Sequence, residues 1–134
     1  MSKNKLDLLR RPRRLRQSKS IRNLFQETEL SVGQLIQPIF IHDGEHAREK
    51  IESMPGICRL SLSELIKECK EIINLGLGGV ALFPKVDDRL KCNLAKEALN
   101  PNNLIYTAIK ELNSAFPDLN IITDIALDPY TISG

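Results

Sequence analysis

The sequence predicts an α/β fold: part of a (β/α)8 TIM barrel, about three βα units long, preceded by an extended N-terminal arm. Apolar runs rich in β-branched residues begin at Ile36, Val80 and Ile121, about forty residues apart, and amphipathic helices separate them. Strands that alternate with helices form a parallel sheet with right-handed crossovers. No glycine-rich phosphate loop follows any strand, which favours a barrel over a nucleotide-binding sheet.

Length and composition set the domain organisation. A complete barrel needs eight units in roughly 250 residues, whereas this chain has 134. We therefore expect a basic arm over residues 1–30 and the first part of a truncated barrel over residues 31–134. No apolar window approaches the roughly 18 residues of a membrane span. We expect no secretory signal, because no apolar region follows the basic start. Three cysteines without paired spacing fit reduced thiols, so we expect a cytoplasmic protein.

Charge is distributed unevenly along the chain. Residues 1–22 contain nine Lys or Arg and one Asp, a net charge of +8, and because the whole chain carries +2, the remainder carries −6. The run Arg10–Arg16 is typical of a patch that binds nucleic acid or an anionic membrane surface. It is also Arg-rich and acid-poor, as transit peptides are. The third possibility is an arm that wraps a neighbouring subunit.

The first predicted strand is Ile36–Ile41, with Pro38 near its start. The loop His42–His46 follows, and its two histidines have a spacing that suits a metal on a helix. Because Gly44 argues against a helix here, we do not expect this pair to bind a metal. Composition then predicts a turn at Ser53–Gly56.

Two amphipathic helices carry the 3.6-residue apolar period. The first begins at Ser61-Leu62-Ser63-Glu64, which has the form of a capping box, and ends at Gly76. The second is predicted to begin at Asn100-Pro101 and to end before Pro117. The segment between them, residues 86–99, is expected to be a polar loop, partly helical.

The second strand, Val80–Phe83, ends at Pro84 and is followed by Lys85. This is a position at which a catalytic lysine can lie. We favour a solvated surface lysine, whose charged form is promoted by Asp87 and Asp88 nearby in the sequence.

The third strand is predicted to begin at Ile121, to be buried, and to continue to the Asp128-Pro129 stop. Side chains alternate across a strand, so Asp124, Ala126 and Asp128 are expected to share one face. Two acids at the carboxyl end of a buried strand suggest the polar mouth of an α/β fold. The structural alternative is that Asp124 bonds a neighbouring backbone and Asp128 caps a turn.

An ordered set of motifs resembles the N-terminal part of the porphobilinogen synthase family, also called δ-aminolevulinic acid dehydratase. The similarity runs from about Arg10 to near the end of the chain. The motifs that carry it are, in order, Arg11-Pro12-Arg13-Arg14-Leu15-Arg16, Gln37-Pro38-Ile39-Phe40, Ser53-Met54-Pro55-Gly56, Arg59-Leu60-Ser61, Ala81-Leu82-Phe83-Pro84, Ala115-Phe116-Pro117-Asp118 and Thr123-Asp124-Ile125-Ala126-Leu127-Asp128-Pro129-Tyr130-Thr131. Members of the family are more than twice as long as this chain.

The resemblance implies a hydro-lyase that condenses two 5-aminolevulinate molecules to porphobilinogen in tetrapyrrole (heme) biosynthesis. It also implies a homo-octamer in which the N-terminal arm embraces a partner subunit, with no role for nucleic acid or membrane. The two Schiff-base lysines of the family lie on later strands, beyond Gly134, and Lys85 matches neither. We therefore expect the chain to be an N-terminal fragment that is inactive alone.

The resemblance also assigns the site residues. Asp124 matches an active-site aspartate, and Asp128 belongs with it in the catalytic group. Ala126 and Asp128 match positions that are cysteines in zinc-dependent members, so the chain resembles the magnesium-using branch, and no zinc site is supported. No residue is assigned to a metal or to an organic cofactor. The family continues with Ser-His-Gly after Tyr-Thr, whereas this chain has Ile132-Ser133-Gly134.

A second hypothesis stays open beside the enzyme fragment. In this hypothesis the basic arm binds nucleic acid or an anionic surface, and the rest of the chain is part of a binding module without catalytic activity. Strong salt-dependent binding to DNA or RNA distinguishes the two.

Overall fold

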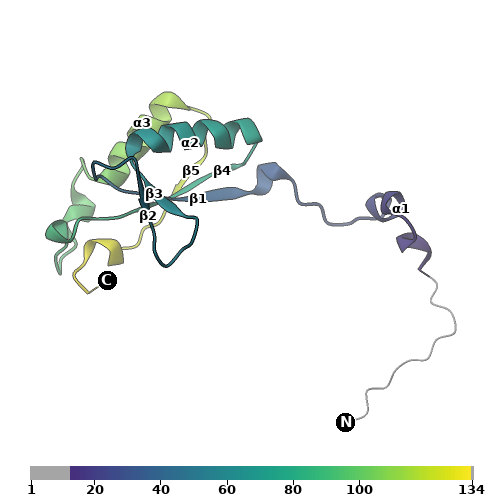
Figure 1. Cartoon of the computed structure of the whole chain (residues 1–134), viewed down its shortest axis with the longest axis horizontal. Coiled ribbons are helices and arrows are strands. Elements are labelled where there is room, and N and C mark those ends of the chain that lie inside the picture. Colours follow the sequence, from purple (N-terminus) through teal and green to yellow (C-terminus); the bar gives the residue numbers. More distant parts are fainter. Residues whose placement is uncertain (1–12, 134) are drawn as a thin grey trace, which may run out of the picture. The chain divides into compact units, whose positions relative to one another are not determined.

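The computed structural model describes residues 13–133 (Figure 1). The chain divides into two compact units between Leu30 and Ser31, at the boundary where the sequence separates the expected arm from the expected barrel segment. That the first unit serves as an arm stays a prediction. The start of the basic run, including Arg10 and Arg11, lies outside the described residues. Among the residues that the structure describes, no helix is both long and apolar enough to cross a membrane.

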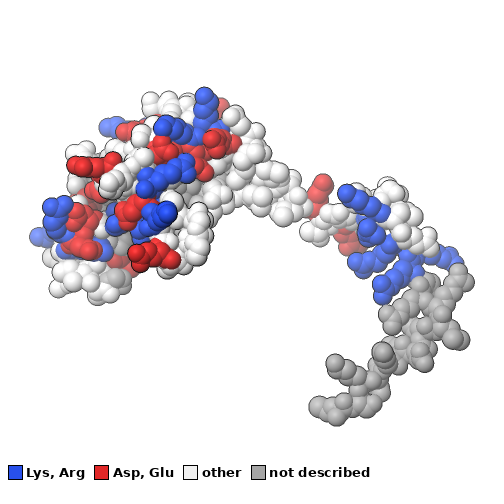
Figure 2. Space-filling view, viewed as in Figure 1, with Lys and Arg blue, Asp and Glu red and all other residues white. Residues whose placement is uncertain are grey.

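The first unit contains a 3-10 turn, η1 (Arg14–Arg16), and a short helix, α1 (Lys19–Leu24). Ser18 caps this helix, because its hydroxyl accepts a hydrogen bond from the Ile21 N–H at 3.2 Å. Basic side chains gather around these two turns (Figure 2). Along the described sequence no acidic residue occurs before Glu27, so the charge asymmetry of the sequence is concentrated on this unit.

The second unit is built on a five-stranded sheet with the order β2-β3-β1-β4-β5. Three parallel neighbours form its centre and one edge: β1 (Ile36–Ile41), β4 (Gly79–Pro84) and β5 (Ile121–Thr123). The sequence did not predict two further short strands, β2 (Arg48–Lys50) and β3 (Cys58–Leu60). β3 is parallel to β1, and β2 is antiparallel to β3. The predicted α/β architecture is confirmed.

Helices α2 (Leu62–Leu75) and α3 (Leu104–Ala115) cover one face of this sheet (Figure 1). Alternate side chains of β1 and β4 point to the helices, as the two-residue period of a strand requires. The other face carries Phe40 and Phe83, whose ring centroids are 5.6 Å apart. The core between sheet and helices consists of Ile39, Ile41, Leu60, Leu65, Cys69, Ile72, Val80, Leu82, Ile105, Ala108 and Leu112.

The first large helix begins and ends where the sequence predicts. Ser61 is its N-cap residue and Gly76 its C-cap, with a left-handed φ of 77°. The hydrogen bonds of the predicted capping box do not form. The Ser61 hydroxyl pairs with that of Ser63, and the Glu64 carboxylate accepts a bond from Arg48. Because both side chains bind these polar partners, they do not form the expected hydrogen bonds with the backbone N–H groups at the start of the helix.

The second large helix begins later than predicted. Asn103, and not Asn100, is its N-cap residue, and the Asn103 Oδ1 accepts a bond from the Tyr106 N–H at 2.9 Å. The preceding loop is partly helical, as expected, because it forms two 3-10 turns, η3 (Asp88–Leu90) and η4 (Lys96–Leu99). Asn100 ends the second of these turns.

The third parallel strand differs most from its prediction. It ends at Thr123, and its residues are half-buried or exposed. Within the described residues β5 pairs only with β4, so the chain beyond it lacks a second strand to pack against and leaves the sheet. Ile125 is 97% exposed, and the chain then forms the 3-10 turn η5 (Asp128–Tyr130). The prediction that three side chains share one strand face is therefore wrong for Asp124, Ala126 and Asp128.

We predict that Gly79→Ala destabilises the second unit by about 1–3 kcal/mol. A Cβ atom at this position would lie 2.6 Å from the backbone oxygen of Asn120. That oxygen accepts a hydrogen bond from the Val80 N–H at 2.9 Å, so it cannot withdraw without loosening the pairing of β4 with β5. Urea unfolding followed by circular dichroism measures the loss.

Gly33→Ala is the matched control. Gly33 lies in the 3-10 turn η2 (Val32–Gln34), and a Cβ atom there would have its nearest neighbour at 3.8 Å, an ordinary contact. Equal losses of stability in the two variants would contradict the steric explanation.

Candidate functional site

Polar side chains gather where the strands of the sheet end. His42 follows β1 directly and Lys85 follows β4, while Arg59 lies in β3 and Glu49 in β2. The carboxyl ends of parallel strands meet at one edge of a sheet, and in α/β proteins this edge carries the functional site. We call these four residues the Glu49 cluster.

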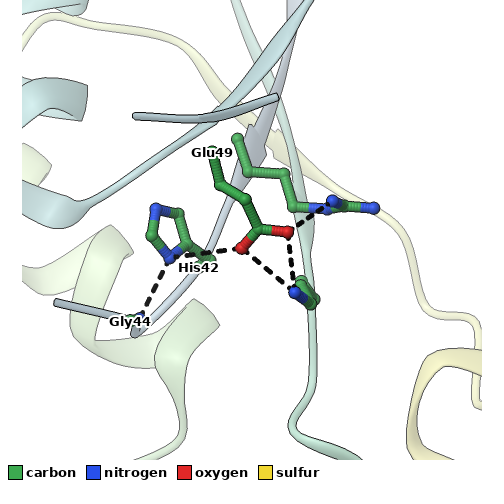
Figure 3. Close-up of polar contacts among 5 residues, drawn as sticks. His42, Gly44 and Glu49 are labelled. Carbon is green, nitrogen blue, oxygen red and sulfur yellow. Dashed lines mark hydrogen bonds and ion pairs between the residues drawn. The ribbon is translucent and has the colours of Figure 1, made fainter. Parts of the chain in front are cut away.

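Glu49 is the centre of the cluster (Figure 3). The Lys85 Nζ donates to both carboxylate oxygens, at 2.7 Å and 3.0 Å, and the Arg59 Nη1 donates to Oε1 at 2.8 Å. The side chain of Glu49 is 33% exposed, that of Lys85 47% and that of Arg59 27%. Lys85 is therefore partly solvated, as predicted, but it is ion-paired, which the sequence did not indicate.

His42 lies behind this ion pair and is only 3% exposed. The Gly44 N–H donates to the His42 Nδ1 at 3.0 Å, and the same Nδ1 lies 3.9 Å from the Glu49 Oε2. Because Nδ1 accepts a hydrogen bond, the ring hydrogen sits on Nε2 in the neutral tautomer. Nε2 is buried and has no hydrogen-bond partner within residues 13–133. The ring thus fixes the turn at Gly44 through one nitrogen only.

The charges around the cluster are arranged in local pairs. The hydrogen bond from Lys85 lowers the pKa of Glu49, against the opposing effect of burial. Hydrogen bonds from Arg89 lower the pKa of Asp87 to about 2. Asp88 pairs with Lys91 at 2.7 Å. The partner of Lys85 is therefore Glu49, and not the two aspartates that are its neighbours in sequence.

The two predicted catalytic aspartates lie outside the Glu49 cluster. Asp124 comes directly after β5, and Asp128 begins η5; both are exposed. Within the described part of the chain, no ion pair or hydrogen bond joins either carboxylate to the cluster. The turn that carries Asp128 is held by Tyr130, which is buried with Val86 and Ala95.

The residues that the structure describes contain no group of three or more His, Cys, Asp or Glu side chains able to hold a metal ion. Cys69 lies in the core, and burial raises the pKa of its thiol to about 11, which favours the protonated thiol. Cys58 lies in β3 and Cys92 in the loop after η3, and both are half-buried. The three thiols therefore belong to separate parts of the described chain.

Sequence reasoning missed Glu49 and Arg59. The available signal was the turn at Ser53–Gly56 between two polar segments, which is compatible with a short hairpin. Strands of three residues with charged side chains carry too little periodicity to be recognised from sequence.

We predict that Lys85→Met raises the pKa of Glu49 toward its ordinary value of 4.5. Since the pKa is lowered in the folded state, the ionised carboxylate stabilises the fold above the ordinary pKa, and this contribution is lost as the pH falls through the lowered value. A carbon-13 NMR titration of the side-chain carboxyl group measures the midpoint. Lys67→Met is the matched control, because it should raise the pKa of Glu64 instead. An unchanged Glu49 midpoint in Lys85→Met would contradict the assignment.

Comparison with known proteins places this geometry in a family. A sequence model of the family "Delta-aminolevulinic acid dehydratase" matches residues 9–134. The delta-aminolevulinic acid dehydratase of Chlamydia pneumoniae is 46% identical over 129 residues, which are 96% of this chain and 39% of that protein. The chloroplastic enzyme of Selaginella martensii is 46% identical over 130 residues, 96% of this chain and 31% of that protein.

A solved structure agrees with the sequence comparison. The crystal structure of the Toxoplasma gondii delta-aminolevulinic acid dehydratase (porphobilinogen synthase), in complex with the reaction product porphobilinogen, is similar with a TM-score of 0.86 and 44% identity. The similarity covers 95% of this chain and 36% of that chain, so this chain spans less than two-fifths of the length of the relatives described here. The match over nearly the whole sequence, the parallel β1-β4-β5 order and the relatedness above 40% establish that the chain belongs to the delta-aminolevulinic acid dehydratase family.

Proposed function

We propose that this chain supplies the first three βα units of a porphobilinogen synthase, which condenses two 5-aminolevulinate molecules to porphobilinogen with loss of two waters. One observation carries the proposal: Asp124, at the carboxyl end of the third parallel strand, lies in a segment that is 44% identical to a porphobilinogen-bound structure. The reaction needs amines that form imines with the substrate. The resemblance assigns these amines to lysines outside the chain.

In this proposal the chain provides carboxylates and not the nucleophile. Asp124 is free of ion-pair partners within residues 13–133, so its carboxylate is available to hold the ammonium group of 5-aminolevulinate or to transfer a proton. Asp128 would order a water molecule or a cation nearby. Lys85 is unsuited to imine formation, because its Nζ already donates to both oxygens of Glu49.

The proposal extends to magnesium in preference to zinc. Magnesium binds carboxylate oxygens and water, whereas structural zinc sites favour thiolate and imidazole ligands. Asp128 is an exposed oxygen ligand, and Ala126, two positions before it, offers none. Bound magnesium would neutralise carboxylate charge at the barrel mouth, and Asp128 is the residue of this chain that would contribute to holding it.

The first unit is proposed to serve as the subunit-contact arm of a homo-oligomer, an octamer by resemblance. Its support is the combination of five Lys or Arg side chains over residues 13–22 with exposed apolar side chains on the same short unit, namely Leu15, Leu24 and Phe25. Such a segment suits the acidic flank of another subunit. A polyanion such as nucleic acid is the competing partner.

We predict that the 134-residue chain alone makes no porphobilinogen and that activity appears on mixing it with the C-terminal part of a full-length relative. Asp124→Asn should then lower kcat about 10²-fold, the usual effect of losing a proton-transfer group. Asp118→Asn is the matched control, because Asp118 is exposed and precedes the same strand at its opposite end. A colorimetric porphobilinogen assay measures the activity of both variants. The same assay tests the metal: activity that is removed by chelation should return with Mg²⁺ and not with Zn²⁺.

Two results would contradict this assignment. Porphobilinogen formed by the isolated chain would make a local lysine such as Lys85 the nucleophile. Equal activity of the Asp124→Asn and Asp118→Asn mixtures would remove Asp124 from the catalytic group.

We predict that deleting residues 1–19 from a full-length relative, by alignment, shifts its assembly toward smaller oligomers. The reason is that the arm loses eight of its nine cations, each worth about a kcal/mol or less at an exposed contact, together with the exposed Leu15. Light scattering coupled to size exclusion measures the mass. An unchanged assembly, combined with loss of salt-dependent DNA binding, would support the binding-module hypothesis instead.

A further inference from the structure

We infer that Tyr130 is a positioning residue: its buried ring fixes the backbone that carries Asp124 and Asp128, and thereby sets where the two carboxylates lie. Residues 124–129 are called the aspartate segment below. The role of Tyr130 in catalysis rests on the proposed function of the two aspartates, whereas the anchoring of the segment does not.

The first observation is that neither carboxylate is held by contacts of its own. Both side chains are exposed, and within residues 13–133 no ion pair or hydrogen bond fixes either of them. The place of each carboxylate is therefore set by the backbone that carries it. A group that transfers a proton or binds an amine must lie within hydrogen-bond reach of its target, so this backbone has to be held in place.

The second observation is that, along the described part of the chain, the backbone of the aspartate segment bonds only within its own turn. β5 ends at Thr123, so its ladder with β4 stops before the segment. The Tyr130 N–H donates to the Leu127 carbonyl at 3.0 Å. The Thr131 N–H donates to the Asp128 carbonyl at 3.2 Å. These bonds give the turn its shape, but they do not attach it to the sheet.

The third observation is that Tyr130 makes this attachment. It is the only buried residue of the described chain after β5, with 8% of its surface exposed. The ring is buried with Val86, which lies just beyond β4, and with Ala95. The Tyr130 carbonyl accepts a hydrogen bond from the Cys92 N–H at 3.2 Å. One side chain and one backbone bond thus join the turn to the loop that follows β4.

The aspartate segment is therefore attached to the rest of the unit at its two ends. β5 holds the end before Asp124, and Tyr130 holds the end after Asp128. In catalysis a misplacement of about 1 Å can cost about 10²-fold in rate. Tyr130 thus acts through the two aspartates, and contact between its ring and the reacting atoms is not required.

The first measurement tests the anchoring itself. Nitrogen-15 relaxation of the 134-residue chain gives the order parameters of its backbone amides, with the C-terminal part of a relative added where the chain alone does not stay monomeric. In Tyr130→Ala the order parameter at Asp128 should fall from about 0.85, the value of a rigid backbone, to below about 0.6. The order parameters of β1 and β4 should stay unchanged. Tyr130→Phe keeps the ring and should leave the segment ordered.

The matched control is Tyr106→Ala. Tyr106 is the other tyrosine of the chain, and it is 47% exposed on α3. Its removal should leave the order parameters of the aspartate segment unchanged.

The second measurement tests whether Tyr130 acts through the aspartates. In the porphobilinogen assay on the mixture with the C-terminal part, Tyr130→Ala should lower kcat about 10-fold or more, because the carboxylates lose their position. In a chain that already carries Asp124→Asn and Asp128→Asn, the same substitution should change kcat by less than about 2-fold, because the effects of residues that act as a unit are not additive.

An aspartate segment that is mobile in the unsubstituted chain, or equally ordered in Tyr130→Ala, would overturn the anchoring. If circular dichroism shows that Tyr130→Ala is unfolded, Val86→Ala, which trims the same buried cluster, decides. A fall in order confined to the segment supports the anchor, and unchanged order there overturns it.

The kinetic result is read separately. An equal loss of kcat with and without the two aspartates would overturn the positioning role. Absence of porphobilinogen from every mixture would count against the proposed function only, since the relaxation measurement decides the anchoring without any reaction.

Discussion

The fold of the second unit depends on the parallel pairing of β1 with β4. These strands are in register over all six residues of each. This register places Ile39 beside Leu82, so that the alternate side chains of both strands form one apolar surface. Helices α2 and α3 cover this surface because packing against it removes their own apolar faces from water.

The same alternation gives the sheet its second face, and the common end of the strands gives it a polar edge. Phe40 and Phe83 point away from the helices, toward the side that is the interior of a barrel. The strands end together, so the residues that follow them are brought to one edge although they are some forty positions apart in sequence. His42 and Lys85 meet at Glu49 for this reason.

Two groups of polar residues thus lie after the strands, and they differ in character. The Glu49 cluster is internally paired and includes the buried His42. Asp124 and Asp128 are exposed and unpaired within residues 13–133. The charges of the Glu49 cluster are thus neutralised locally, whereas the charges of the two aspartates are exposed to solvent.

The sequence by itself determined the α/β class, the two large helices and the family, because these depend on local periodicity and on ordered motifs. It also predicted the start of the third strand at Ile121, with Asp124 inside that strand. Only the tertiary structure decided that the strand stops at Thr123, that Asn103 caps α3, and that Glu49 pairs with Lys85. The physical reason is that strand length depends on neighbouring strands, and ion pairs depend on distances in space. The contact between Glu49 and Lys85 joins residues 36 positions apart, which no local pattern records.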